Sequence, residues 1–120
     1  MGFEVLDAIA ISEMTSREIA RAIADRVGDR PAYLTFDIDF IDPAFAPGTG
    51  TPCPGGPDVY KSREILFELD ETGVNVVGGD MVEVAPIYDG PGQITALAGA
   101  TIASDILELI AHSRTRSAAS

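Results

Sequence analysis

The stretch "YLTFDIDFIDPAFAPGTGTPCPGG", residues 33–56, sets an apolar run directly against three carboxylates, Asp37, Asp39 and Asp42. Residues 32–38 are rich in aromatic and β-branched side chains and almost continuously apolar, which is typical of a strand covered on both faces. After Asp42, prolines alternate with glycines, and this composition forbids regular structure and stiffens a long loop. The stretch therefore predicts a buried strand that ends in acids and leads into a rigid loop.

The segments on either side of this strand alternate between strand and helix patterns. Thr15 and Glu18 have the spacing of a capping box, and Gly28 stands where a C-terminal cap would fall. These signals predict an amphipathic helix over residues 15–28. The patterns elsewhere predict strands over residues 2–10 and 74–84, helices over residues 59–73 and 93–112, and a frayed tail over residues 113–120.

The order of these elements predicts the fold class. Strands that alternate with helices form an α/β fold, in which helices cover a parallel sheet. We expect one domain over residues 1–120, because no repeat, low-complexity segment or linker divides the chain. In the second long helix, Ile65, Leu66 and Leu69 should be buried. In the last helix, Asp105 and Glu108 should mark the solvent-exposed stripe.

The composition limits the partners of the protein. The chain has 8 Lys and Arg against 19 Asp and Glu, and its net charge of -11 argues against nucleic acid or an anionic membrane and is compatible with cationic ligands. No uninterrupted apolar run reaches the ~18 residues of a membrane span. Because Cys53 is the single cysteine, no intrachain disulfide can form, and we expect a cytoplasmic location.

The carboxylates after the central strand are candidates for cation binding. Alternation in an extended segment puts Asp37 and Asp39 on one side and Ile38 on the other. Two close carboxylates repel each other until one is protonated or a cation lies between them. Oxygen donors favour Mg²⁺, Mn²⁺ or Ca²⁺. In the alternative explanation, Asp39 and Asp42 cap the turns that begin the loop, and Asp42 before Pro43 suits this role well.

The loop and the next strand end add further polar candidates. Glu83 could hold a cationic group through paired hydrogen bonds, with Asp80 as its alternative, although spacing alone favours a solvated strand end for both. Thr49 and Thr51 could place hydroxyls over the same crevice or simply hydrogen-bond within the turns. His112 is the only histidine, and we expect it at a helix end or on the surface.

Together these motifs resemble those of the ureohydrolases, the family of arginase, agmatinase and guanidinobutyrase. The segments "VVGGDMVEVAPIYD" and "ITALAGATIASDILELI" are similar to the strand that leads to the family's substrate-binding Glu and to its closing helix. The loop "FAPGTGTP" is closer to the agmatinase and guanidinobutyrase branch than to arginase. The positions that match the family's DxD pattern are Thr35, Phe36, Asp37, Ile38, Asp39, Pro43, Pro47, Gly48 and Gly56.

The resemblance implies a fold, an activity and a set of site residues. The fold is an arginase-like three-layer α/β/α arrangement with a parallel sheet, of which these residues would form the C-terminal part. The activity is hydrolysis of a small cationic guanidino compound to urea and an amine at two Mn²⁺ ions bridged by hydroxide, in a trimer or hexamer. Asp37 would bridge both metals and Asp39 would bind one of them. Glu83 would hold the guanidinium, and Thr51 would line its pocket.

Several of the family's ligands are not found among these 120 residues. The remaining metal ligands come from an upstream histidine and an Asp-Ala-His-x-Asp motif, and the proton-shuttle histidine is also missing. We therefore assign no catalytic residue and expect the chain alone to be inactive.

Two other functions are alternatives. The chain could be a non-catalytic fragment, or the oligomer-packing half of a split ureohydrolase. It could also be an Mg²⁺-dependent phosphatase of the haloacid-dehalogenase type, which places a DxD after an apolar strand. The phosphatase fits less well, because Phe40 and Ile41 stand where that family has a small hydroxylated residue.

Overall fold

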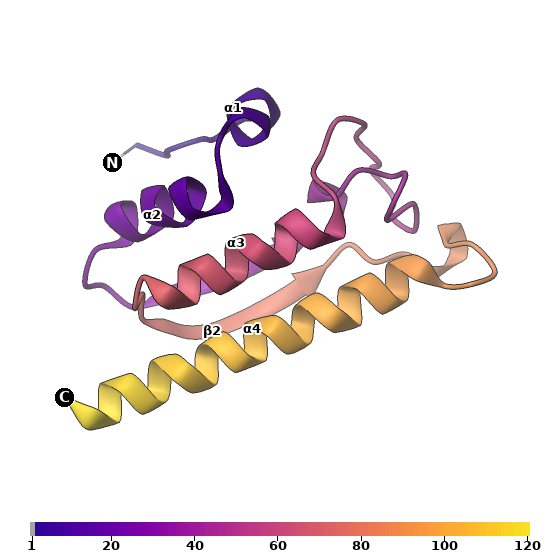
Figure 1. Ribbon diagram of the computed structural model, residues 1–120. Helices are drawn as coiled ribbons and strands as arrows, with labels where there is room; N and C mark the ends of the chain where they lie inside the picture. Colours follow the sequence, from indigo (N-terminus) through magenta and orange to yellow (C-terminus); the bar gives the residue numbers. More distant parts are fainter. Residues whose placement is uncertain (1) are drawn as a thin grey trace.

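The computed structural model describes residues 2–120 and contains two strands flanked by helices (Figure 1). The segment from β1 through α3 to β2 is a parallel strand–helix–strand unit. The helices are α1 (Ala8–Glu13), α2 (Ser16–Val27), α3 (Val59–Glu71) and α4 (Ile94–Ala119), the strands are β1 (Ala32–Asp37) and β2 (Val76–Val82), and two short 3₁₀ turns span Ile38–Phe40 and Pro86–Tyr88.

The sheet directs both strand ends to one edge. β1 and β2 pair in parallel, with Tyr33 opposite Gly78 and Asp37 opposite Val82. Because parallel strands carry their carboxyl ends to the same edge, the last residue of β1 and the residue after β2 are neighbours there. These residues are Asp37 and Glu83, so the fold brings acids from both strands to one corner.

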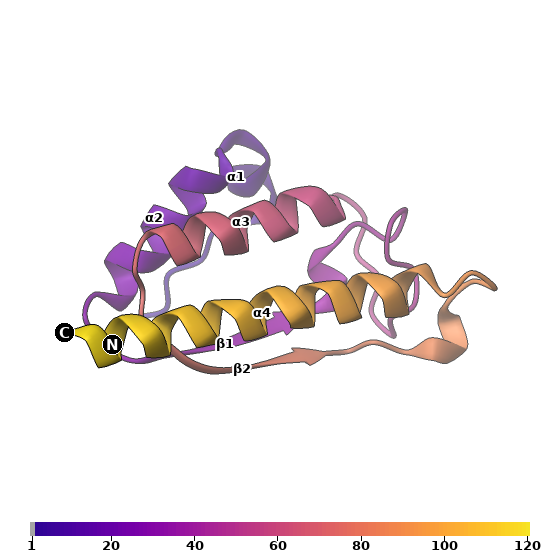
Figure 2. The ribbon, with the colours of Figure 1, turned by 60° about the horizontal axis from the view of Figure 1, so that its bottom comes forward.

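The three long helices form one layer on one side of the sheet (Figure 2). α3 packs between α2 and α4, and it buries Ile65, Leu66 and Leu69 as predicted. The opposite face of the sheet is uncovered within the described residues, and Tyr33 and Thr35 are exposed there. The helix layer and the sheet are thus two of the three layers of the predicted α/β/α fold.

The core lies between the sheet and the helix layer. Phe36 of β1, Leu66 of α3 and Ile102 of α4 belong to one buried cluster. β2 and α4 approach so closely at Gly79 that a Cβ there would lie 2.7 Å from the Cγ2 atom of Ile106. This close packing fixes β2 against the middle of α4.

The predicted strand over residues 2–10 is wrong. Residues 2–7 have no regular structure, and Ala8–Glu13 is the short helix α1. Asp7 begins this helix by accepting the backbone N–H of Ala10 at 2.9 Å. The apolar side chains of this stretch are mostly exposed. A strand requires a hydrogen-bonded neighbour as well as apolar composition, and among the described residues this stretch has none.

The last helix is longer than predicted, and the solvent-exposed stripe predicted at Asp105 and Glu108 is confirmed only at Glu108. Fraying of the tail beyond Ser113 stays a prediction. α4 continues to Ala119, and Ser113 is buried where it hydrogen-bonds to the chain before β2. Asp105 is only 7% exposed and pairs with Arg63 of α3 at 2.7 Å. α3 and β2 bury one face of the long helix between Thr95 and Ser113, through contacts that its sequence pattern does not reveal.

α4 is the one helix among the described residues that is long and apolar enough to cross a membrane by length and composition. α4 contains no uninterrupted apolar run of this length, because charged residues interrupt it. Its mean hydropathy of 1.6 is nevertheless high. This is weak evidence for a membrane span, since core helices meet the same criterion. One face of α4 is buried against β2 and α3.

Candidate functional site

The two aspartates of the DxD lie on a turn at the end of β1. Asp37 Oδ1 accepts the backbone N–H of Asp39 at 3.0 Å, and Ile38–Phe40 form a 3₁₀ turn. Ile38 is fully buried, which anchors the turn in the core and leaves both carboxylates partly exposed. The expected separation of Ile38 from the two acids is therefore present, although a turn produces it where strand alternation was expected.

The carboxylates at this corner are close enough to affect one another. Burial raises the pKa of Asp37, and the negative charges of Asp39 and Glu83 raise it further. The N–H of Asp39 acts in the opposite direction by hydrogen-bonding to the Asp37 carboxylate. The structure thus brings Asp37, Asp39 and Glu83 together as one acidic corner, and we use this name for the three residues.

Asp42 organises the loop. Its two carboxylate oxygens accept the backbone N–H groups of Ala44 and Gly55, each at 2.8 Å. These two bonds lower the pKa of Asp42. Its own N–H donates to the carbonyl of Pro57 at 2.9 Å, which closes the loop at its base. Both carboxylate oxygens are engaged in turns, as the capping explanation for Asp42 predicts.

Thr51 joins the loop to the DxD. Its Oγ1 hydroxyl donates to Asp39 Oδ2 at 2.7 Å. A donated hydrogen bond fixes the orientation of the carboxylate that accepts it. The hydroxyl of Thr51 therefore contacts a candidate metal ligand, and its role in lining a substrate pocket stays a prediction.

Glu83 adopts an unusual backbone conformation directly after β2. Its φ is 66°, in the left-handed region that costs a residue with a side chain roughly 1–2 kcal/mol. The next residues hold this turn, because Val84 forms an antiparallel bridge with Thr49 and the Ala85 N–H donates to the Gly48 carbonyl at 2.7 Å. Strained backbone of this kind gathers at functional sites. No sequence signal predicted the conformation, since glycine or asparagine usually occupies it.

Asp89 and Thr95 support the loop and were missed by the sequence reasoning. Asp89 accepts the N–H groups of Thr95 and Ala96 at 3.2 and 3.0 Å and so caps the start of α4. Thr95 Oγ1 in turn accepts the N–H of Gly48 at 2.8 Å. The position of Asp89 shortly before a helix is a capping signal that could have identified it. The contact between Thr95 and Gly48 has no local signal, because it joins residues far apart in sequence.

Two other candidates lie apart from the acidic corner. Asp80 Oδ2 accepts the hydroxyl of Tyr33 at 3.1 Å, so Asp80 is engaged within the sheet. His112 hydrogen-bonds to Asp70 and belongs to the contact between α3 and α4. It is half exposed, as expected, but it lies within α4 and not at its end.

The acidic corner offers oxygen donors of the type that hard divalent cations prefer. Asp37 and Asp39 are suited by chemistry to Mn²⁺ or Mg²⁺. Within residues 2–120, however, no group of three or more His, Cys, Asp or Glu side chains is arranged to hold a metal ion. The donors of these residues therefore fit part of such a site and do not complete one.

Fold and site together define an α/β protein with an acidic site at the carboxyl ends of parallel strands. Residues 1–108 match the Arginase family, and the chain belongs to this family. This match sets aside the haloacid-dehalogenase alternative.

Relatives and solved structures agree with this assignment. The chain is 50% identical over 113 residues to an agmatinase of Photorhabdus laumondii, a match that covers 94% of this chain and 36% of the relative. A crystal structure of a hypothetical agmatinase from Burkholderia thailandensis matches all of this chain and 36% of its own, with 48% identity and a TM-score of 0.86. Proclavaminate amidino hydrolase of Streptomyces clavuligerus gives a TM-score of 0.87 at 38% identity, over 93% of this chain and 37% of its own. The chain thus spans about a third of the length of the proteins it matches.

Proposed function

We propose that these residues form part of the active site of a manganese-dependent amidinohydrolase, which converts an agmatine-like guanidino compound to urea and an amine. The observation that carries the proposal is the acidic corner, where the parallel register of β1 and β2 places Asp37 and Asp39 beside Glu83 within an arginase-family fold. The net charge of -11 suits a small cationic substrate. The agmatinases among its relatives support the choice of substrate class.

Each residue of the site has a distinct task in this proposal. Asp37 and Asp39 would hold manganese, which when bound lowers the pKa of water and so supplies a nucleophile for the guanidinium carbon. Thr51 orients Asp39 through its hydrogen bond. Glu83 would grip the guanidinium with paired hydrogen bonds, in a position set by its strained turn.

We further propose that the 120 residues alone are inactive, and that the complete enzyme works in the cytoplasm as a trimer or hexamer. Two carboxylates give weak metal affinity, and no described histidine accompanies the acidic corner to assist the leaving amine. A second candidate is a non-catalytic role as a packing half of a larger assembly. The uncovered face of the sheet, with exposed Tyr33 and Thr35, favours it.

A direct assay tests the activity of the chain. Urea release is measured with agmatine and with 4-guanidinobutyrate in manganese buffer, and we expect no turnover above background from the 120 residues. Turnover at an ordinary enzymatic rate, about 1 s⁻¹ or more, would contradict this expectation.

The roles of Asp39 and Glu83 are tested in a complex of two polypeptides that has restored activity. This chain is co-expressed with the segment of the Burkholderia thailandensis agmatinase that does not align with it. Asp39→Asn should remove most of the bound manganese, measured by elemental analysis. Glu83→Gln should retain manganese and raise KM by about tenfold or more, because it weakens a charged hydrogen bond to substrate. Equal loss of metal in both variants would contradict the separate roles.

A further inference from the structure

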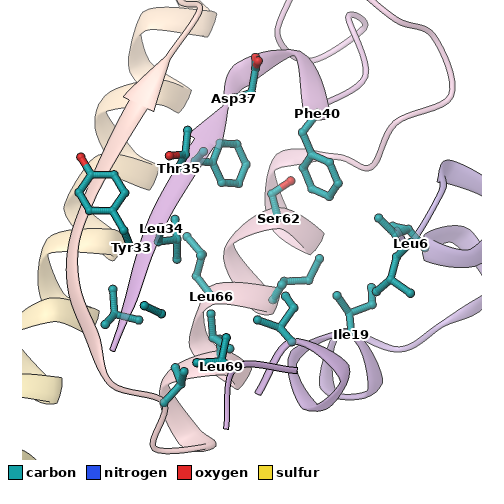
Figure 3. Close-up of a pocket in the computed structure, with 18 residues that line it drawn as sticks. Leu6, Ile19, Tyr33, Leu34, Thr35, Asp37, Phe40, Ser62, Leu66 and Leu69 are labelled. Atoms are coloured by element: carbon teal, nitrogen blue, oxygen red, sulfur yellow. The ribbon is translucent and has the colours of Figure 1, made fainter. Parts of the chain in front are cut away.

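An apolar pocket of about 420 Å³ lies between β1 and the helices α2 and α3 (Figure 3). Its walls carry Leu34, Leu66 and Leu69, whose side chains offer no hydrogen-bond partner to a guanidinium. Asp37 lies at the rim of this pocket, and its carboxylate is directed away from Leu66 and Leu69. Recognition of a guanidinium therefore depends on the acidic corner and on the backbone that shapes it.

One residue of the acidic corner, Glu83, has a strained backbone. Its φ of 66° lies in the left-handed region, where a residue with a β-carbon is uncommon. β2 ends at Val82, so the hydrogen bonds of the sheet do not hold this conformation. A strained residue persists where the surrounding structure over-determines it. The contacts of the residues that follow Glu83 therefore have to supply the restraint.

Two backbone contacts with the loop restrain the residues after Glu83. Val84 forms an antiparallel bridge with Thr49. The N–H of Ala85 donates to the carbonyl of Gly48 at 2.7 Å. The position of Gly48 therefore sets the direction in which the chain leaves Glu83.

Thr95 of α4 holds Gly48 in turn. Its side chain is fully buried, and its Oγ1 accepts the N–H of Gly48 at 2.8 Å. Asp89 accepts the N–H groups of Thr95 and Ala96 and so fixes the first turn of α4. Gly48 is thus held at its N–H by α4 and at its carbonyl by the turn that follows Glu83.

A second contact joins α4 to this turn. Gly99 lies four residues after Thr95 and is buried, and a Cβ there would lie 3.2 Å from Cγ2 of Val84. The close approach of Val84 to the helix backbone leaves little space for Val84 to move. The turn after Glu83 is therefore packed against α4 as well as hydrogen-bonded to the loop.

We infer that Thr95 is a positioning residue, whose hydroxyl holds Gly48 and thereby fixes the backbone turn that directs Glu83 toward the substrate. The inference rests on the function proposed above, in which Glu83 binds the guanidinium. Because Thr95 is buried, it acts through Glu83 and not by contact with the substrate. Its removal should therefore weaken substrate binding and leave the affinity for manganese unchanged.

Nuclear magnetic resonance of the isotope-labelled chain tests the effect of Thr95 on conformation. The coupling constant between the amide proton and the α-proton of Glu83 depends on its φ. Thr95→Val replaces the hydroxyl with a methyl group of similar size, and Glu83 should lose its left-handed φ because Gly48 loses its partner. A folded Thr95→Val chain in which this coupling constant is unchanged would overturn the inference.

Two further variants are matched controls for Thr95→Val. Thr95→Ser retains the hydroxyl and should retain the left-handed φ of Glu83. Thr101→Val makes the same exchange further along α4, where the hydroxyl donates to the carbonyl of Leu97 at 2.8 Å, and it should also retain this φ. An equal loss of the left-handed φ in Thr95→Ser would show that the hydroxyl is not the cause. Thr95→Ala replaces Thr95→Val where circular dichroism shows that the latter is unfolded.

Kinetics of the complex with the Burkholderia thailandensis segment test the consequence for the substrate. Thr95→Val should raise KM for agmatine by about threefold or more and leave kcat within about twofold, because substrate and transition state lose the same contact with Glu83. The manganese content should stay the same, and Thr95→Ser should restore KM. An unchanged KM in an active complex, or loss of most of the manganese, would overturn the inference.

Failure of the proposed function is distinguishable from failure of this inference. A complex that hydrolyses no guanidino compound would contradict the proposed function. The coupling constant of Glu83 in the chain alone then decides whether Thr95 fixes its conformation.

Discussion

Gly48 lies between Asp89 and Thr95, in a space that admits no side chain. A Cβ at this position would lie 2.9 Å from the Cβ atoms of both residues. The same residue donates to Thr95 Oγ1 and accepts from Ala85, and this joins the loop to the turn that holds Glu83. A small residue is thus required here by close packing, since the φ of Gly48 is not left-handed.

Gly48→Ala should lower the free energy of unfolding by about 1–3 kcal/mol, because the added methyl group overpacks this contact. The measurement is urea unfolding followed by circular dichroism. Gly50→Ala is the control, since a Cβ at Gly50 meets nothing within 4 Å, and it should change stability by less than about 0.5 kcal/mol. A Gly48→Ala variant as stable as Gly50→Ala would mean that the loop is not fixed in this way.

At the scale of elements, α3 forms ion pairs of different burial with its two neighbouring helices, α4 and α2. Asp105 of α4 is 7% exposed and pairs with Arg63, whose guanidinium also lies 5.3 Å from the ring of Phe67. Arg17 and Glu68 form a comparable pair between α2 and α3, but the Arg17 side chain is 64% exposed. A comparison of the two pairs therefore tests how burial changes the contribution of an ion pair to the free energy of unfolding.

Arg63→Met should destabilise the chain by about 2–3 kcal/mol, because it leaves the buried Asp105 carboxylate without a partner. Arg17→Met should cost about 0–1 kcal/mol, as exposed pairs do. Both values come from chemical unfolding at neutral pH. Equal costs for the two substitutions would show that the Asp105 carboxylate reaches solvent when Arg63 is removed.

The contact of His112 with Asp70 should make the stability of the α3–α4 packing dependent on pH. The hydrogen bond to Asp70 is the main cause that raises the pKa of His112 above its usual value, and Asp70 also holds Arg116. Because His112 has a higher pKa in the folded state, its protonated form stabilises the fold at pH values below its unfolded pKa of about 6.5. This stabilisation is lost as the pH rises through the pKa of His112 in the folded state.

His112→Gln should therefore remove a pH-dependent part of the stability. The difference in unfolding free energy between the natural chain and the variant should be largest near about pH 5.5 and smallest near about pH 8.5. Urea unfolding at intervals across this range measures it. A difference that stays constant with pH would show that only the packing of the ring matters.

The accuracy of the sequence predictions differed among elements for physical reasons. The capping box of Thr15 and Glu18 and the dense apolar run of β1 are local signals, and both elements form where they were predicted. Residues 2–10 have strand-like composition but no strand to pair with. Asp105 looked solvated because its partner Arg63 lies 42 positions away in sequence.

The sequence predicts that the acids at the two strand ends are neighbours, but it does not predict the backbone geometry that holds them. The DxD pattern, the strand ends and the family resemblance place Asp37, Asp39 and Glu83 at one edge of the sheet, and the roles of these residues stay predictions. The 3₁₀ turn and the left-handed φ of Glu83 depend on contacts with Gly48 and Thr49 across the fold. Such tertiary contacts leave no pattern in neighbouring residues, so sequence reasoning could not find them.

At the scale of the whole molecule, self-association is governed by a balance between charge and uncovered sheet. The net charge of -11 separates copies at neutral pH, whereas the open edge of β1 and the exposed face with Tyr33 favour their contact. Salt screens the repulsion over about 10 Å at 0.1 M and does not weaken apolar contact. Titration of the acids toward the pI of 4.2 removes the repulsion itself.

Light scattering of the isolated chain should therefore increase from low salt to about 0.5 M NaCl, and also as pH falls toward 4.2. Tyr33→Lys and Leu107→Lys change the net charge equally, and only the first removes an aromatic ring from the uncovered sheet face. We expect Tyr33→Lys to reduce association at high salt although it lowers the net negative charge, and Leu107→Lys to have little effect. Association that weakens with salt would instead mean that charged side chains hold the copies together.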